Sequence, residues 1–371
     1  MATDAAPQEH RLLAIDWMRG LVMILMTLDH ASAAFNSGRL FTDAVALDVY
    51  PLPAPDFFTR WVTHLCAPAF VFLAGTSLAL SVARRMQKGE RPSDIDRHII
   101  LRGLIITAFE LWRSVIARAA WMIPLQVLYA LGMGMVCMAA LRRLPTRWLL
   151  AFALGGWVVS EPLALWAASL HGPLAIPATL LFATGSLGPY VRVSYPVFPW
   201  LCTMTLGFCF GRWLVSQPGN VVGARAARVL LAWGLCLLGL YLVLRGVNGP
   251  GNMGLLRHDG SLVQWLHVSK YPPSLAFWGL ELGLGALLLA LAFRARLAWP
   301  PVVLFGQTAL FFYLLHAHLL DAAARLLGMR HAAGLLATYL SAAVVILVLY
   351  PLCRWYRGYK RAHPTGWPQY I

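Results

Sequence analysis

The feature that most constrains this chain is the recurrence of long, nearly uncharged apolar runs from one end to the other. Of its 371 residues, 59% are hydrophobic and 12% are charged, whereas soluble domains carry about 25% charged residues. Apolar runs of about 20 residues match the thickness of the hydrocarbon core, in which a helix satisfies all of its own backbone hydrogen bonds. The sequence therefore predicts an all-α polytopic membrane protein, with residues 1–371 forming one transmembrane domain.

Ten membrane spans are expected, and they place both termini on one side of the membrane. The spans are 12–35, 57–83, 98–119, 121–141, 148–170, 196–215, 226–246, 274–293, 302–322 and 332–353. No linker or repeat divides them, and three larger loops are expected on the outer side, at 36–56, 171–195 and 247–273. The N-terminal residues lack a basic region followed by a cleavage site, so the first span is expected to be retained.

Basic residues gather in the loops on the side of the termini, which accounts for the net charge of +15. The positive-inside rule places residues 1–11 and the tail 354–371 in the cytoplasm, and we expect a multi-pass protein of the bacterial inner membrane. Attraction to anionic membrane lipid follows from the same charge, and no nucleic-acid partner is needed to explain it. The basic residues on this side are Arg84, Arg85, Lys88, Arg91, Arg97, Arg102, Arg142, Arg143, Arg147, Arg212, Arg225, Arg228, Arg294, Arg296, Arg354, Arg357, Lys360 and Arg361.

The six cysteines lie in or beside apolar runs, and none forms a CxxC pair or a Cys/His metal spacing. We interpret them as small buried hydrophobic residues and expect no metal. Gly75, and Gly207 with Gly211 in a GxxxG spacing, are typical of close helix packing in membranes.

Ionisable residues inside the spans are the strongest functional signal, because each costs about 2.5–3.5 kcal/mol on insertion scales. His30 lies roughly 9 Å beyond the midpoint of the first span, at 1.5 Å per residue, and His64 reaches a similar outer depth from the second span. The other members of this outer layer are Glu110, Arg113, Glu281, His316 and His318. Their common depth predicts a cavity open to the periplasmic side.

The first span also connects two membrane levels. Arg19 and His30 are eleven residues apart, so they lie about 20° apart on one helix face and roughly 16 Å apart along it. Asp16 is close enough to Arg19 to pair with it, whereas Asp29 is about 100° from His30 and is not expected to orient that ring.

His316 and His318 are about 200° apart on one helix, so at most one of them is expected to face a common site.

Five segments of the chain resemble the transmembrane acyltransferases. "RLLAIDWMRGLVMILMTLDH" has the Arg, ten residues, then His spacing of the opening helix of that superfamily, and Arg19 and His30 fit it. Within the superfamily the chain is most similar to bacterial relatives of heparan-alpha-glucosaminide N-acetyltransferase. The supporting segments, which keep their order, are "FFTRWVTHLCAPAFVFLAGTSLAL", "YPVFPWLCTMTLGFCFGR", "KYPPSLAFWGLELG" and "GQTALFFYLLHAHL".

The resemblance implies transfer of an acetyl or other acyl group from cytosolic acyl-CoA to a sugar or glycan acceptor on the far side of the membrane, as in polysaccharide modification. It implies that Arg19 lies at the CoA end and that His30 is catalytic. In the human lysosomal branch an asparagine occupies the position of His30, and the catalytic histidine comes from the loop before the second span. His64 is the histidine of the second span nearest to that place, so both remain candidates for the general base.

We assign expected roles on these grounds. The catalytic candidates are His30, His64, Asp29 and Glu110, the acyl-CoA candidates are Arg19, Asp16, Arg60 and Arg113, and the acceptor candidates are Lys270, Tyr271, Glu281, His316 and His318. His64, Glu110 or Arg113 could orient the base or stabilise an oxyanion. Direct transfer and an acyl-imidazole intermediate both stay open, as does assembly into a homodimer.

Two other classes of function fit part of the pattern. Charged residues and histidines near the middle of ten spans also describe a proton-coupled secondary transporter. The absence of an internal repeat and of paired Gly/Pro-broken helices argues against it. A non-enzymatic scaffold for envelope assembly would tolerate alanine at His30, His64 and Glu110, and would leave many costly buried charges without a task.

Overall fold

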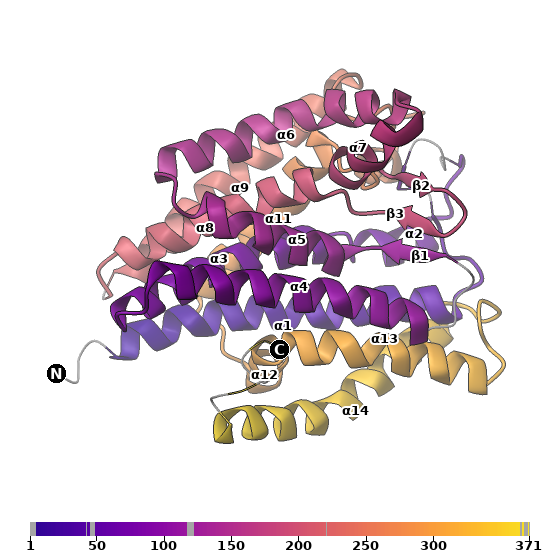
Figure 1. Ribbon diagram of the computed structural model, residues 1–371. Helices are drawn as coiled ribbons and strands as arrows, with labels where there is room; N and C mark the ends of the chain where they lie inside the picture. Colours follow the sequence, from indigo (N-terminus) through magenta and orange to yellow (C-terminus); the bar gives the residue numbers. More distant parts are fainter. Residues whose placement is uncertain are drawn as a thin grey trace.

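A computed structural model describes residues 5–41, 43–44, 49–116, 122–219, 221–363, 366 and 370, and it leaves the side chains of 5–12 and 113–116 undescribed. The long helices lie roughly along one common axis and form a single bundle (Figure 1). The helices are α1 Ala5–Phe35, α2 Ala54–Trp61, α3 Cys66–Gln87, α4 Pro92–Ile116, α5 Val127–Leu141, α6 Thr146–Ser169, α7 Ala175–Phe182, α8 Val197–Ser216, α9 Val222–Val247, α10 Leu262–Leu266, α11 Leu275–Arg294, α12 Pro300–Gln307, α13 Ala309–Leu326 and α14 Leu335–Ala362.

Each of the ten expected spans falls on one or two of these helices. Within the described residues, six helical segments are long and apolar enough to cross a membrane: Ala54–Gln87, Thr146–Ser169, Val222–Val247, Leu275–Arg294, Ala309–Leu326 and Leu335–Ala362. The chain is therefore an all-α membrane protein, as the apolar runs predicted. The number of ten spans and the side of the termini stay predictions.

Three of the expected spans differ from continuous helices, and proline explains two of the differences. The second span is interrupted by a turn at 62–65, between α2 and α3. Pro68 has no backbone N–H and its ring clashes with the carbonyl four residues earlier, which disfavours a continuous helix at this point. The ninth span is interrupted at Thr308, which separates α12 from α13.

The fourth span begins later than expected, because residues 123–125 form a strand. Pro124 holds the residue before it in an extended conformation, and α5 begins only at Val127. Strand β1 (Ile123–Leu125) pairs in parallel with β3 (Val191–Val193), and β3 pairs antiparallel with β2 (Gly185–Leu187), in the order β1-β3-β2. This small sheet closes one end of the bundle, at the opposite end from the N-terminus (Figure 1).

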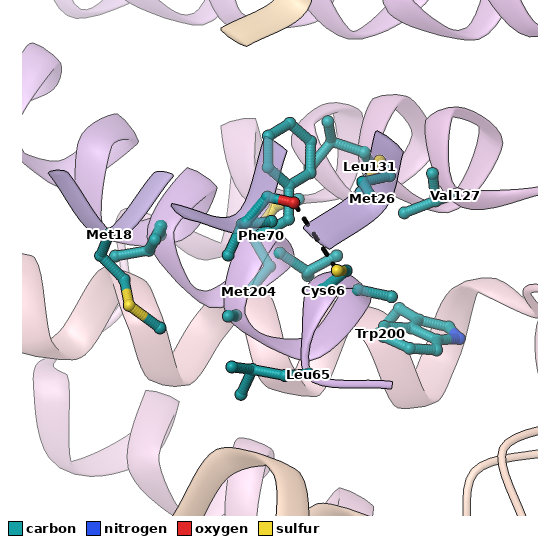
Figure 2. Close-up of a cluster of buried hydrophobic side chains, with 14 of the residues drawn as sticks. Met18, Met26, Leu65, Cys66, Phe70, Val127, Leu131, Trp200 and Met204 are labelled. Carbon is teal, nitrogen blue, oxygen red and sulfur yellow. Dashed lines mark hydrogen bonds between the residues drawn. The ribbon is translucent and has the colours of Figure 1, made fainter. Parts of the chain in front are cut away.

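Helix α1 lies at the centre of the bundle and packs against α3, α11, α12, α13 and α14. Its buried side chains join a core shared with α3, α5 and α8, in which Met18, Met26, Cys66 and Met204 meet (Figure 2). Helices α6 and α14 lie at opposite edges in Figure 1 and carry large apolar side chains on their outer faces. Lipid-facing surfaces have this character.

Two helix pairs approach so closely that only glycine fits between them. A Cβ atom at Gly75 of α3 would lie 1.9 Å from the carbonyl oxygen of Met204, and one at Gly207 of α8 would lie 1.9 Å from that of Phe72. The predicted small-residue packing at Gly75 and Gly207 is confirmed. A second reciprocal pair joins α1 to α12. A Cβ atom at Gly20 would lie 1.8 Å from the carbonyl oxygen of Val302, and one at Gly306 would lie 1.8 Å from that of Asp16.

Candidate active site

A cavity of about 810 Å³ opens at the end of the bundle that carries the small sheet. Its walls come from the last turns of α1, the break between α2 and α3, strands β1 and β3, and the loops before α8 and α11. Segments distant in the sequence thus meet around one space, but of the polar residues whose common depth predicted a cavity only His30 lines it among those described. His30, Asp29 and Arg60 lie on its wall, together with Lys270 and Tyr271.

His30 lies on the cavity wall near the end of α1, and its Nδ1 is 2.7 Å from Nε2 of His316 on α13. His316 is fully buried, and its Nδ1 lies 3.1 Å from the carbonyl oxygen of Phe312, one turn earlier. His318 points elsewhere, with its ring 5.3 Å from that of Trp112 on α4. The two histidines lie about 200° apart around α13, so only one of them is expected to face this region.

Asp29, next to His30, is held by cations from two segments. Arg39 donates to its carboxylate at 3.0 Å and to its backbone carbonyl at 2.6 Å, and Arg60 donates to the same carboxylate oxygen. The hydroxyl of Thr63 lies 3.1 Å from that oxygen. These contacts hold the carboxylate in place, and its charge interacts with His30.

Asp43, in the loop after α1, connects the other walls. It accepts hydrogen bonds from Arg60, with Nε at 2.9 Å, and from Nε2 of His64 at 3.1 Å. Its backbone carbonyl accepts from the amides of Lys270 and Tyr271, at 2.8 and 3.1 Å. Burial alone would raise the pKa of Asp43, but the charge of Arg60 and the contact with His64 outweigh it and hold the pKa well below its usual range.

The cavity carries a surplus of positive charge. Its wall has four cationic side chains, Arg39, Arg60, Arg192 and Lys270, and two carboxylates, Asp29 and Asp43. The two carboxylates are already bound to Arg39 and Arg60. Lys270 is buried at 3% exposure, and no acidic group lies in salt-bridge distance of it among the residues described. Arg192 and Lys270 are thus available to an anionic group.

Two tyrosines close the wall opposite α1. The hydroxyls of Tyr195 and Tyr271 are 3.4 Å apart. Burial raises the pKa of Tyr195, whereas at Tyr271 the charges of Lys270 and Arg60 outweigh the effect of burial and lower the pKa.

The other end of α1 carries a second group of polar residues. Arg19 pairs with Asp16 at 2.8 Å, as predicted, and donates to the hydroxyl of Ser77 on α3. Arg102 of α4 and Lys360 of α14 are close enough to interact electrostatically with Arg19. The Nε atom of Arg102 is buried without a partner among the described residues. This cationic cluster, formed by Arg19, Arg102 and Lys360, is a candidate site for an anion.

The sequence profile of the catalytic region of heparan-alpha-glucosaminide N-acetyltransferase matches residues 11–244 of this chain. The match covers more than half of the chain and includes Arg19, His30, Arg60 and His64. The chain belongs to this family. The family resemblance of the sequence is thereby confirmed, and the protein is placed among acetyltransferases. None of the curated proteins matches the chain in a direct comparison.

The residues matched to the N-acetyltransferase family do not include every residue that lines the cavity. The matched region ends at residue 244, before Lys270, Tyr271, Tyr313 and His316. These residues belong to the site because the fold brings α11 and α13, with the loop before α11, against α1 and Asp43.

Several predicted site residues lie outside the cavity of this N-acetyltransferase relative. Glu110 is buried on α4, where its carboxylate accepts from the amides of Leu128 and Tyr129 at 3.1 and 3.4 Å and so caps the start of α5. Glu281 lines a separate crevice whose other lining residues are apolar. The side chain of Arg113 is among those not described. His64 is buried behind Asp43 and reaches the cavity only through it.

Sequence reasoning missed Asp43, Arg39 and Arg192 at the cavity, and Arg102 and Lys360 at the other end. Arg39 and Asp43 lie in a loop and Arg192 in the short strand β3, so no helical periodicity indicates which way their side chains point. The last two were interpreted as topology signals only. Among the described residues, no group of three His, Cys, Asp or Glu side chains is placed to hold a metal ion.

Proposed function

We propose that this protein is a membrane acetyltransferase that moves an acetyl group from acetyl-CoA to a sugar or glycan acceptor. The donor binds at the cationic cluster, the acceptor enters the cavity, and His30 is the general base. One observation carries the proposal: α1 alone places Arg19 in the cationic cluster and His30 in the wall of the cavity. Family membership supports the reaction class.

The cationic cluster suits the nucleotide end of the donor. The phosphates of CoA require charge-assisted donors, and Arg offers a planar fork that binds them bidentately. The unpartnered Nε of Arg102 supplies a buried donor beside Arg19. We propose that this end faces the cytosol, in line with the basic loops, and that the cavity faces the periplasm of a bacterial inner membrane.

The interval between the two ends has the right length and lining for the pantetheine arm. Eleven residues of α1 rise about 16 Å. Apart from Thr27, the side chains buried along this interval are apolar and rich in methionine, and Met18 and Met26 of α1 and Met204 of α8 are among them (Figure 2). Methionine has flexible torsions and a polarizable sulfur, so this core can rearrange around a thin chain.

At the cavity, His30 removes a proton from the amino or hydroxyl group of the acceptor as that group attacks the carbonyl carbon of the thioester. A carbon–nitrogen or carbon–oxygen bond forms, the carbon–sulfur bond breaks, and the thiolate of CoA receives the proton from His30. Asp29 favours the imidazolium through its charge. Lys270 and Tyr271 stabilise the negative charge on the carbonyl oxygen or contact the acceptor.

The surplus positive charge of the cavity favours acceptors that carry a negative group beside the reacting amine or hydroxyl. Arg192 and Lys270 line the cavity, and no carboxylate among the described residues forms a salt bridge with either, so a carboxylate, phosphate or sulfate on the sugar could pair with them.

The test uses purified full-length protein in detergent, acetyl-CoA as donor and a glucosaminide as the first acceptor probe. Release of the CoA thiol and acetylation of the sugar are measured together. We expect His30→Ala to keep acetyl-CoA binding and lower transfer by about 10²–10⁴-fold, the usual contribution of a general base. Arg19→Ala should weaken acetyl-CoA binding instead.

His331→Ala is a matched control, because His331 is an exposed histidine outside the cavity. Normal transfer by His30→Ala would contradict the assignment of the base, and loss in His64→Ala alone would move it to His64. A protein that neither binds nor cleaves acetyl-CoA would contradict the proposed function and favour a carrier of another solute.

A further inference from the structure

The rings of His30 and His316 form an in-plane pair. Their planes differ by 11° and their centroids are 4.8 Å apart, while Nδ1 of His30 and Nε2 of His316 are only 2.7 Å apart. Two parallel rings stacked face to face could not bring two nitrogens this close while the centroids stay so far apart. The displacement is therefore mainly sideways, which is the geometry of a nitrogen-to-nitrogen hydrogen bond.

The backbone settles which nitrogen donates. The carbonyl oxygen of Phe312 can only accept, so Nδ1 of His316, 3.1 Å away, carries a proton. A neutral imidazole has one N–H, and Nε2 of His316 is then the acceptor. With both rings neutral, as a base awaiting a proton requires, Nδ1 of His30 donates to it.

We propose that His316 is the positioning residue for the base, fixing His30 in the tautomer whose bare Nε2 can take a proton from the acceptor. This inference rests on the proposed function of His30. His316 itself is fully buried and does not line the cavity, so it acts through His30. The chain from the Phe312 carbonyl through His316 to His30 replaces the carboxylate that orients the histidine in many hydrolases.

The pair is held by packing as well as by the hydrogen bond. Tyr313, buried on the cavity side of α13, lies edge-on to both rings, with centroids 6.2 Å from His30 and 5.4 Å from His316. The ring of Phe312 lies 5.5 Å from that of His316. After His30 takes the proton, Nδ1–H still points at His316, so the same contact stabilises the imidazolium.

The experiment compares three variants of the full-length protein. His316→Phe removes the acceptor but keeps a ring, His316→Gln keeps an acceptor near the place of Nε2, and His318→Phe is the matched control from the other face of α13. We expect His316→Phe to lower kcat about 10- to 100-fold with an unchanged KM for acetyl-CoA. His316→Gln should recover part of the loss, and His318→Phe should stay close to the wild type.

A second readout does not depend on turnover. Protein labelled with ¹⁵N only in histidine shows by NMR which ring nitrogens are bare, and the signals of His30 are those lost in His30→Gln. We expect His30 in the wild type to have an unprotonated Nε2 and a protonated Nδ1, and His30 in His316→Phe to be a mixture of the two tautomers. Thermal unfolding of each variant reports whether the fold is intact.

The outcomes separate this inference from the proposed function. A bare Nδ1 on His30 in the wild type, or equal kcat for His316→Phe and His318→Phe, would overturn the role of His316. If no acetyl transfer is found for any acceptor probe, the proposed function fails, while the NMR result still decides the tautomer. Equal losses in folded His316→Phe and His316→Gln would also count against positioning through an acceptor.

Discussion

Asp43 joins two parts of the cavity wall and the histidine behind it, through its side chain to Arg60 and His64 and through its carbonyl to the loop before α11. A buried carboxylate with such partners is costly to remove, because its cation stays behind in a medium of low dielectric constant. The residue therefore serves the shape of the site more than its chemistry.

We predict that Asp43→Asn lowers the free energy of unfolding by about 2 kcal/mol, less than the about 3–5 kcal/mol typical of a broken buried pair. The loss is reduced because Asp29 still accompanies Arg60. Denaturation in detergent, followed by tryptophan fluorescence, measures it. Asp259→Asn is the control, since Asp259 is exposed in the loop between α9 and α10, and an equal loss in both variants would contradict the role of Asp43.

The same residue predicts a pH dependence. The folded-state pKa of Asp43 lies below its value in the unfolded chain, about 3.9, so its stabilising contribution is complete above that pH and is lost as the pH falls further. We expect the wild type to lose this part of its stability progressively as the pH falls below about 4, and Asp43→Asn to lack that part of the slope. Parallel pH profiles of the two proteins would rule the prediction out.

At the scale of helices, a break in the second expected span positions several residues of the candidate active site. The break between α2 and α3 leaves Arg60, Thr63 and His64 at a turn inside the bundle, where their side chains reach Asp29 and Asp43. Irregular backbone at membrane depth is tolerated where protein or a water-filled cavity surrounds it. Pro68 makes this break a local consequence of the sequence.

The close contact of α1 with α12 gives a prediction about packing. Gly20→Ala would place a Cβ 1.8 Å from the carbonyl of Val302, so the two helices must separate, at a cost of about 1–3 kcal/mol. Gly239→Ala in α9 meets no atom within 4 Å and should stabilise by up to about 1 kcal/mol, as alanine does in a helix. Thermal unfolding of both in one detergent measures the difference. A Gly20→Ala protein as stable as Gly239→Ala would show that the contact can open freely.

The sequence predicted the helices well and the site in part. Periodicity and depth found Asp16 with Arg19, and brought His30 and His316 to one level, because helical geometry fixes these relations locally. Arg39 and Asp43 could not be predicted in this way, since the path of a loop depends on contacts such as that of Asp43 with Lys270, and Arg192 could not because it lies in a short strand whose place depends on its pairing with β1 and β2. The cap formed by Glu110 on α5 was equally hidden, because it depends on how two helices pair.

At the scale of the whole molecule, the two groups of polar residues lie at opposite ends of one bundle, and the proposed reaction needs them on opposite sides of the membrane. We predict that Gly260→Cys, in an exposed outer loop, reacts with an impermeant maleimide in intact cells. Lys88→Cys, exposed between α3 and α4, should react only after lysis. The unmodified protein gives the background from its own cysteines. Labelling of both positions in intact cells would contradict the proposed orientation.

The reciprocal glycine contacts between α1 and α12 have a consequence for donor selection. These contacts hold the helix that carries both Arg19 and His30, so under the proposed function the distance between the CoA nucleotide and the base is fixed. This fixed distance selects for the length of the pantetheine arm of CoA and does not depend on the acyl group at its end. Discrimination among acyl groups then depends on the space beyond His30. Changes in the loops around that space would alter the acyl group that is transferred and leave CoA binding unchanged.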